Sequence, residues 1–355
     1  MNARSKAQQP FTEEELLGLQ QSLLNLGKAF DEANFTEFWS AVAHIPHTTD
    51  WDVTLQNAER LKVLLNLGAD LTGEKWLHRV LDDGHWKTAS SMETPFVVLV
   101  TGLNGIRKST ALYQPWFSHV LREALGSGVD GNFSENKPTG RNSFFRQLDY
   151  VMATACNEEF SRLYKFAKSM EAMGVSEETS LRRYSDLKAA IFSRYRTVAE
   201  LLGIVLLQIA QNESKNCIME TSGRNEAMFA YIDRLYQDTK YQKLALRFVV
   251  NDIEAAQKSV DRRMRQEMMT GQRARVPEEV VRVNQGGPYG SDVLPDVQFE
   301  SENVWKQVET GAIATDWLKA TIYIDANDKE PWTARALRPD GTHGKVYAYE
   351  PLHCT

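Results

Sequence analysis

The chain has 355 residues and a formal net charge of −6, because it contains 41 Lys and Arg residues and 47 Asp and Glu residues. Hydrophobic residues make up 42% and charged residues 25%, as in globular chains that form one large domain or two smaller ones. These values exclude wholesale disorder and disfavour nucleic-acid binding through bulk positive charge.

Residues 1–94 are predicted to form a helical N-terminal extension. Leu16, Leu19 and Leu23 recur at helical intervals behind an acidic first turn. The same apolar spacing continues over residues 54–71. Because no second copy of this pattern follows at a fixed period, we predict no repeat architecture.

Residues 95–330 are predicted to form an α/β domain. Residues 96–100 are a continuous apolar run, as expected for a strand covered on both faces of a parallel sheet. Short apolar or β-branched runs at 216–220, 244–250 and 320–324 predict three further strands. Helical stretches separate these strands, and this alternation predicts an α/β fold with a mainly parallel sheet.

Helices are predicted between the strands at 109–125, 143–173, 176–210, 225–236 and 253–270. The two long stretches together form a helical insertion at 143–210. The tail at 331–355 is predicted to be a C-terminal β-hairpin extension around the turn Pro339-Asp340-Gly341.

The most specific pattern is VVLVTGLNGIRKST at residues 97–110, where a strand leads into a glycine-containing loop and then a helix. The phosphate-loop pattern G-x-x-x-x-G-K-[ST] requires this context, because its glycines let backbone N–H groups turn toward the phosphates. Gly102, Lys108 and Ser109 match the pattern, and Gly105 matches an additional glycine found in many small-molecule kinases. The alternative is an ordinary strand–turn–helix junction.

Arg107 departs from the pattern, since it occupies the position of the second required glycine. A side chain there must fit a backbone conformation that glycine normally serves. Arg107 either adds a cation for phosphate or indicates a rearranged, nonfunctional loop.

A second element is the predicted strand that ends in Glu220. An acid at the C-terminal end of a central strand lies where ligands bind in open α/β sheets. Glu220 could hold a Mg²⁺-bound water or a substrate hydroxyl. The alternative is a strand-end carboxylate that caps the next helix, as Ser222 could also do.

A third element is an arginine-rich segment after the predicted strand at 244–250. Its members are Arg262, Arg263, Arg265, Arg273 and Arg275. A mobile lid bearing arginines would neutralise the charge that develops during phosphoryl transfer. The alternative is a solvated helix face on which neighbouring acids supply the counter-charges.

In this order of elements the chain resembles the P-loop small-molecule kinases, in particular the zeta-toxin-like kinases, over roughly residues 95–290. The resemblance implies a P-loop NTPase three-layer fold and ATP- and Mg²⁺-dependent phosphoryl transfer to a hydroxyl of a small molecule or nucleotide sugar. The residues implied in ATP binding are Gly102, Asn104, Gly105, Arg107, Lys108, Ser109 and Thr110.

The resemblance also implies roles around the reacting groups. Ser109 and Glu220 would bind Mg²⁺, and Thr221 and Arg224 would contact the substrate, although Thr-Ser-Gly stands here in place of the family's Gly-Thr order. The residues implied in catalysis are Lys108, Glu220, Arg262, Arg265 and Arg275.

The general base is the least specific of these predictions, because the family's Asp motif is missing from residues 129–150. Asp149 is one candidate, and Asp130 and Glu135 are others. The alternative for Asp149 is a solvent-facing position on an amphipathic helix.

A second hypothesis is a nucleotide-binding regulatory or scaffold protein with a degenerate phosphate loop, which Arg107 and the missing Asp motif favour. A third is an NTPase without an acceptor. Three separate cysteines favour a reducing, cytoplasmic location. The apolar runs are too short for a membrane span, so we expect no membrane partner. The sequence leaves the oligomeric state open.

Overall fold

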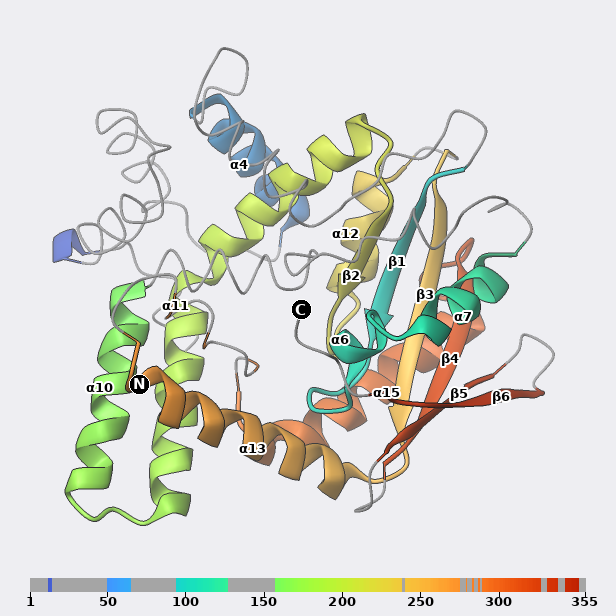
Figure 1. Cartoon of the computed structure of the whole chain (residues 1–355). Helices are drawn as coiled ribbons and strands as arrows, with labels where there is room; N and C mark the ends of the chain where they lie inside the picture. The colour runs from blue at the N-terminus through green and yellow to red at the C-terminus, as the bar shows by residue number, and fades with distance from the viewer. Residues whose placement is uncertain are drawn as a thin grey trace. The chain divides into compact units, whose positions relative to one another are not determined.

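The computed structural model describes residues 12–14, 50–64, 94–126, 157–237, 240–274, 279, 283, 287, 289–326, 331–337 and 342–350. The chain divides into two compact units, and each is described by itself (Figure 1). The first unit comprises Met1–Leu81, Arg146–Gln208 and Asp261–Gly290, and the second comprises Asp82–Phe145, Ile209–Val260 and Ser291–Thr355. Most of the predicted insertion at 143–210 therefore groups with the N-terminal region.

A six-stranded sheet forms the centre of the second unit, with strand order β2-β1-β3-β4-β5-β6. The parallel strands are β1 (Phe96–Thr101), β2 (Cys217–Glu220), β3 (Gln242–Val250) and β4 (Leu318–Asp325). The last two strands, β5 (Thr333–Leu337) and β6 (His343–Ala348), continue the sheet in antiparallel pairing. This arrangement confirms the predicted α/β fold with a mainly parallel sheet.

Strand β1 lies between β2 and β3, and all six of its residues are buried. Figure 1 shows helix α7 (Pro115–Leu125) in front of β3 and β4, and helices α12 (Ala227–Leu235) and α15 (Leu294–Thr310) behind the sheet. Because helices cover both faces, the strand is apolar at consecutive positions instead of alternate ones. Burial on both faces therefore explains the continuous apolar run of β1.

The helix predicted at 109–125 is in fact two helices, so that prediction was wrong. Helix α6 (Lys108–Ala111) ends before Gln114, whose backbone is extended at φ −77 and ψ 139. Pro115 then begins α7. A proline disfavours helical conformation in the residue before it and has no N–H to donate, so it suits the first turn of a new helix.

The described part of the first unit is helical. Its elements are α4 (Trp51–Leu64), α10 (Asn157–Ala172), most of α11 (Glu177–Asn212) and the C-terminal part of α13 (Ile253–Gly271). The rings of Phe160 on α10 and Phe192 on α11 pack edge to face, with centroids 5.9 Å apart. These two helices confirm the long helical stretches predicted at 143–173 and 176–210, except that residues 143–156 lie outside the described residues.

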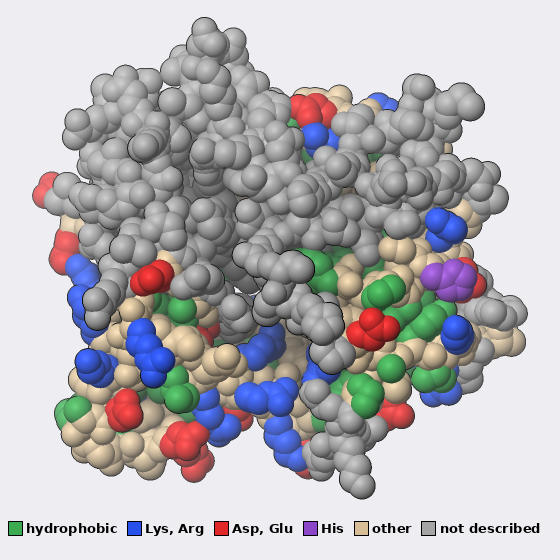
Figure 2. Space-filling model, viewed as in Figure 1, with side chains coloured by type: hydrophobic (Ala, Val, Ile, Leu, Met, Phe, Trp, Pro, Cys, Tyr) green, Lys and Arg blue, Asp and Glu red, His purple; other side chains and the backbone are tan. Residues whose placement is uncertain are grey.

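The predictions for the tail and for the N-terminal region fall partly outside the described residues. The tail forms the antiparallel pair β5 and β6, whereas its turn at 339–341 lies outside the described residues, as do residues 16–26. None of the described helices is long and apolar enough to cross a bilayer. Figure 2 shows Lys and Arg side chains interspersed with Asp and Glu side chains on the described part of this face.

Candidate functional site

The loop at the C-terminal end of β1 contains two glycines with positive φ, Gly102 at 135° and Gly105 at 88°. A Cβ atom at Gly102 would lie 2.6 Å from the carbonyl oxygen of Phe248 in β3. One at Gly105 would lie 2.4 Å from the carbonyl oxygen of Ala256 in α13. The loop therefore lies directly against two backbones, and only glycine fits at these two positions.

The ammonium group of Lys108 lies against this loop. Its Nζ donates hydrogen bonds to the carbonyl oxygens of Gly102 at 2.8 Å and Leu103 at 2.6 Å. The same atom is 3.0 Å from Oε1 of Glu220, and the lysine side chain is 3% exposed. A phosphate bound in the loop would have to compete with these two carbonyls for the ammonium.

Glu220 ends β2 next to the start of the loop, since it pairs with Val100 of β1 in the parallel ladder. Its Oε2 accepts a hydrogen bond from Ser109 Oγ at 2.9 Å, while Oε1 faces Lys108. The pairing of two neighbouring strands thus brings Lys108, Ser109 and Glu220 into direct contact. Strand-end acids lie in this way at the ligand-binding edge of open α/β sheets.

The Ser109 hydroxyl and the Glu220 carboxylate are oxygen ligands of the kind that Mg²⁺ prefers. Magnesium is usually held by one or two protein oxygens together with waters and phosphate oxygens. Among the described residues, no group of three or more His, Cys, Asp or Glu side chains could hold a metal ion. Two protein oxygens would suffice only for a magnesium ion whose other ligands are waters and phosphate oxygens.

Arg107 holds the left-handed conformation, with φ 63 and ψ 26, at the junction of the loop and α6. Its guanidinium carbon lies 4.5 Å from the ring centre of Trp332 and 5.8 Å from that of Tyr349. Both aromatic rings are buried. Burial raises the pKa of the Tyr349 hydroxyl, and the positive charge of Arg107 opposes that rise. The arginine is thus held by a cation–π contact with the C-terminal segment.

The residues that follow β6 also contact the segment after α6. The side chain of Gln114 is buried, and its Nε2 donates to the carbonyl oxygen of Glu350 at 3.2 Å. Its Oε1 accepts from the backbone N–H of Glu350 at 2.8 Å. The ring of Trp116 stacks on that of Tyr347 at 5.4 Å. The C-terminal hairpin therefore supports the loop and α7 as well as extending the sheet.

The turn after β2 returns toward β1. The backbone N–H of Thr221 donates to the carbonyl oxygen of Val100 at 2.9 Å, and its Oγ1 accepts from the N–H of Gly223 at 3.3 Å. Gly223 lies against Thr101, the last residue of β1. Thr221 and Arg224, both half-buried, are thereby placed on the turn beside the end of β1.

Of the other residues predicted for the site, two lie in the loop and α6, two lie on α13, and the rest are outside the described residues. Asn104 and Thr110 are half-buried in the loop and in α6. Arg262 and Arg265 are exposed on the part of α13 that belongs to the first unit, and Arg265 Nε lies 2.6 Å from Glu177 Oε1. The exposure of both arginines and this ion pair agree with the alternative prediction of a solvated helix face. Asp149, Asp130, Glu135 and Arg275 are outside the described residues.

Sequence reasoning missed Trp332, Tyr349 and Gln114 as neighbours of the loop. Trp332 and Tyr349 lie in the tail, for which the sequence predicted only a hairpin around the turn Pro339-Asp340-Gly341. A buried aromatic pair that binds an arginine has no local spacing signature, because its partner is far away in the chain. Composition offered no hint, because three aromatic residues among the 25 of the tail are close to the 10% of the whole chain.

No protein-family model, no curated protein and no solved structure matches this chain.

Proposed function

We propose that this chain is an ATP-dependent phosphotransferase with a P-loop NTPase fold, acting in the cytoplasm on a hydroxyl of a small molecule or nucleotide sugar. One observation carries the proposal: Lys108, Ser109 and Glu220 converge beside a glycine loop at the end of the central strand. This combination of a cation, a hydroxyl and a carboxylate at a strand end suits a nucleoside triphosphate with its metal ion.

Each of the three residues has a distinct role in this proposal. Lys108 turns its ammonium from the Gly102 and Leu103 carbonyls to the β- and γ-phosphate oxygens. Ser109 and Glu220 would hold the Mg²⁺ ion, which would supply positive charge to neutralise the phosphates. Glu220 also orients the lysine ammonium before the nucleotide arrives, because the two groups are already 3.0 Å apart.

The predicted arginine lid and general base remain predictions. Arg262 and Arg265 are exposed, and Arg265 pairs with Glu177, so Arg265 would have to leave this partner to reach a phosphate. The roles of Arg275 and Asp149 concern residues outside the described part of the chain. Thr221 and Arg224 keep their proposed role in substrate contact, since their turn follows Glu220 directly.

A second candidate function is a nucleotide-binding regulatory protein without transfer activity. The conformation of Arg107 favours it, because a cation–π contact holds the guanidinium on Trp332. The two loop carbonyls that already bind Lys108 favour it as well, since they hold the ammonium away from a phosphate group that is to be transferred. A loop stabilised in this way would bind nucleotide and resist the rearrangements that transfer requires.

The decisive experiment measures both nucleotide binding and phosphoryl transfer. Purified protein is incubated with γ-labelled ATP, Mg²⁺ and a metabolite extract, next to a Lys108→Ala variant. Lys243→Ala is the matched control, because Lys243 also pairs with a carboxylate, Asp233 at 2.7 Å, and lies level with Val97 near the start of β1. We expect label on a small molecule with wild type and Lys243→Ala, and none with Lys108→Ala.

The other outcomes separate the alternatives. Tight ATP binding without transfer supports the regulatory protein, and release of labelled phosphate alone supports an NTPase. Wild-type protein that binds no ATP at millimolar concentration contradicts all three. Equal loss of ATP binding in Lys108→Ala and Lys243→Ala would also contradict the proposed site, because Lys108 would then contribute no more to binding than a lysine outside the loop.

A further inference from the structure

Arg107 stands where the phosphate-loop pattern has its second glycine, and its backbone keeps a conformation that glycine adopts without cost. Its φ is 63° and its ψ 26°, in the left-handed region. Its carbonyl oxygen accepts the hydrogen bond that opens α6, from the N–H of Ala111 at 2.9 Å. Because α6 begins at Lys108, the backbone angles of Arg107 set the direction in which Lys108 and Ser109 leave the loop.

The earlier part of the loop is confined by neighbouring backbones. Gly102 lies against the carbonyl oxygen of Phe248 in β3, and Gly105 lies against that of Ala256 in α13. Arg107 differs from these glycines, since a Cβ atom makes the left-handed conformation costly and arginine lacks the short polar side chain that eases it in Asn and Asp. Contacts of the arginine side chain are therefore needed to offset that cost.

Two rings at the ends of the C-terminal hairpin contact this side chain. The guanidinium carbon of Arg107 lies 4.5 Å from the ring centre of Trp332 and 5.8 Å from that of Tyr349. Trp332 directly precedes β5 and Tyr349 directly follows β6, and the N–H of Tyr349 donates to the carbonyl oxygen of Trp332 at 2.9 Å. Both rings are buried, so the guanidinium contacts a close-packed and rigid part of the unit.

A second attachment joins the same segment to the chain after α6. Gln114 Nε2 donates to the carbonyl oxygen of Glu350 at 3.2 Å, and its Oε1 accepts from the N–H of Glu350 at 2.8 Å. The C-terminal segment thus holds the chain on both sides of α6, at Arg107 before the helix and at Gln114 after it. Lys108 and Ser109 lie between these two attachments.

We infer that Trp332 and Tyr349 are positioning residues of the nucleotide site, which act through Arg107 to hold Lys108 and Ser109 where they can bind a triphosphate. The inference rests on the proposed function, because it concerns the same loop. In this role the Arg107 side chain supports the loop backbone instead of contacting phosphate. Because the rings act by way of Arg107, a glycine at this position should make them dispensable.

The test is calorimetric titration with Mg²⁺ and adenylyl imidodiphosphate, a non-hydrolysable ATP analogue. Trp332→Leu should raise the Kd about five- to tenfold, because losing the cation–π contact lowers the fraction of loops in the binding conformation. Added to Arg107→Gly, the same substitution should change the Kd less than about twofold, whatever the affinity of Arg107→Gly itself. A tryptophan that only stabilised the fold would weaken binding equally in both backgrounds.

Trp317→Leu is the matched control. Trp317 is also a buried tryptophan with a cation near its ring, since Lys243 Nζ lies 6.0 Å from the ring centre. It directly precedes β4, which runs parallel to β3 and β1, so it lies at the end of the sheet opposite the loop. We expect Trp317→Leu to change the Kd less than about twofold.

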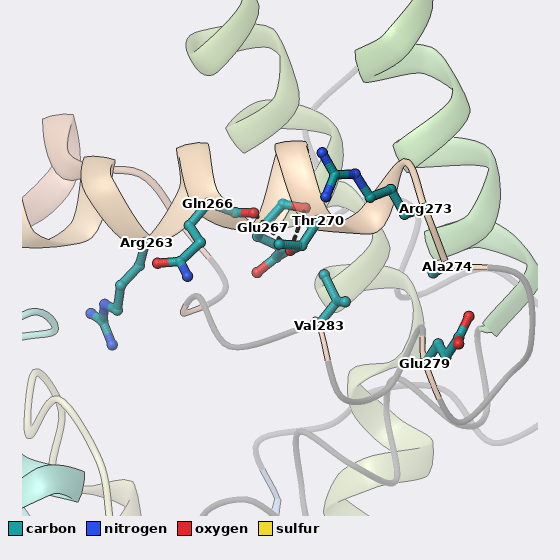
Figure 3. A pocket seen from close by; sticks show the side chains of 8 residues that line it. All are labelled: Arg263, Gln266, Glu267, Thr270, Arg273, Ala274, Glu279 and Val283. Atoms are coloured by element: carbon teal, nitrogen blue, oxygen red, sulfur yellow. Dashed lines mark hydrogen bonds between the residues drawn. The ribbon is translucent and has the colours of Figure 1, made fainter. Parts of the chain in front are cut away.

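A separate pocket could take up the analogue and needs its own control. The first unit contains a cavity of about 380 Å³ along α13, lined in part by Gln266, Glu267 and Thr270 (Figure 3). Glu267 is already paired in a buried network, since its Oε1 accepts from Tyr184 OH at 2.6 Å and Lys188 Nζ lies 2.8 Å from both carboxylate oxygens. Gln266 is exposed, so Gln266→Ala alters the pocket and leaves this network intact. An analogue bound at the loop should have the same Kd in Gln266→Ala as in wild type.

The outcomes separate this inference from the proposed function. If wild type binds the analogue but Trp332→Leu has no effect, or the same effect with and without Arg107→Gly, the inference is overturned and the proposed function stands. A loss in Trp317→Leu or Gln266→Ala as large as that in Trp332→Leu also overturns it. If Trp332→Leu fails to fold by circular dichroism, Trp332→Phe replaces it in the same cycle, with an expected rise in Kd of about two- to threefold.

A readout without nucleotide covers the remaining outcome. If wild type binds no analogue at millimolar concentration, the proposed function fails, and hydrogen–deuterium exchange of residues 102–112 then decides whether the rings hold the loop. Exchange there should be at least about threefold faster in Trp332→Leu than in wild type and unchanged in Trp317→Leu. Equal exchange in wild type and Trp332→Leu would overturn the inference on its own.

Discussion

The guanidinium of Arg107 lies over the ring of Trp332, 4.5 Å from its centre, and this contact joins the candidate phosphate loop to the C-terminal hairpin. Arg107 has a left-handed backbone, which costs a residue with a Cβ atom about 1–2 kcal/mol. A cation–π contact with a half-buried arginine contributes a comparable amount, about 0.5–2 kcal/mol. The hairpin therefore offsets the strain that a non-glycine residue introduces into this loop.

Substitution of Arg107 by alanine and by glycine should have different effects on stability. Arg107→Ala keeps the strain and loses the cation–π contact, so we expect a loss of about 1–2 kcal/mol in the free energy of unfolding. Arg107→Gly removes both, and we expect it to stay within about 1 kcal/mol of wild type. Urea unfolding measures both values.

A double-mutant cycle isolates the contact itself. Combining Arg107→Ala with Trp332→Leu should show a coupling energy of about 0.5–2 kcal/mol, because the two groups touch directly. Additive effects would mean that the contact contributes nothing, and the arginine conformation would then need another cause.

The pair Lys108 and Glu220 should affect both stability and magnesium dependence. Glu220→Gln leaves a buried ammonium without its carboxylate, although the two loop carbonyls remain, so we expect a loss of about 1–3 kcal/mol. The control is Glu123→Gln, whose exposed partner His119 is 3.4 Å away and whose loss should cost less than about 0.5 kcal/mol. Stability is measured by urea unfolding, and magnesium dependence by nucleotide titration at several Mg²⁺ concentrations. Equal losses in the two variants would contradict this account of the site.

The network of Glu267, Lys188 and Tyr184 should be among the most sensitive positions of the first unit. Removing one partner of a fully buried ion pair costs about 3–5 kcal/mol, so Glu267→Gln should lower the thermal midpoint sharply. Replacing both charged partners, in Lys188→Met with Glu267→Met, should recover much of that loss, because no uncompensated charge stays buried. Arg265→Gln, from an exposed pair on the same helix, should change stability by less than about 1 kcal/mol. A double variant less stable than Glu267→Gln would refute the assignment.

The Cys217 thiol should resist alkylation in the folded protein. It is buried and contacts Tyr236 OH at 3.2 Å, and burial raises its pKa to about 12 from an ordinary value of 9.0. Because the folded pKa is the higher one, the stability that this thiol contributes is complete below pH 9 and is lost as the pH rises toward 12. Iodoacetamide labelling at pH 8, followed by peptide mass spectrometry, should modify Cys217 only in urea. Labelling at equal rates in buffer and in urea would contradict the buried position.

Local patterns predicted several elements of this fold correctly. The apolar run of β1, the glycines at 102 and 105, and the long helices α10 and α11 follow from residue spacing, because backbone geometry alone sets those periods. The break at Pro115 was also present in the sequence, and the helix prediction failed because it ignored a local rule for proline. These successes and this error concern neighbours along the chain.

The contacts within the candidate site could not be predicted from local patterns. Sequence alone indicated that Lys108 and Ser109 follow a glycine loop and that Glu220 ends a strand. Their contact exists because β1 and β2 pair in parallel with Val100 opposite Glu220, a register that no local spacing sets. In the same way, only tertiary packing placed Trp332 under Arg107 and Lys188 against Glu267, since burial and charge pairing are decided between segments far apart in the chain.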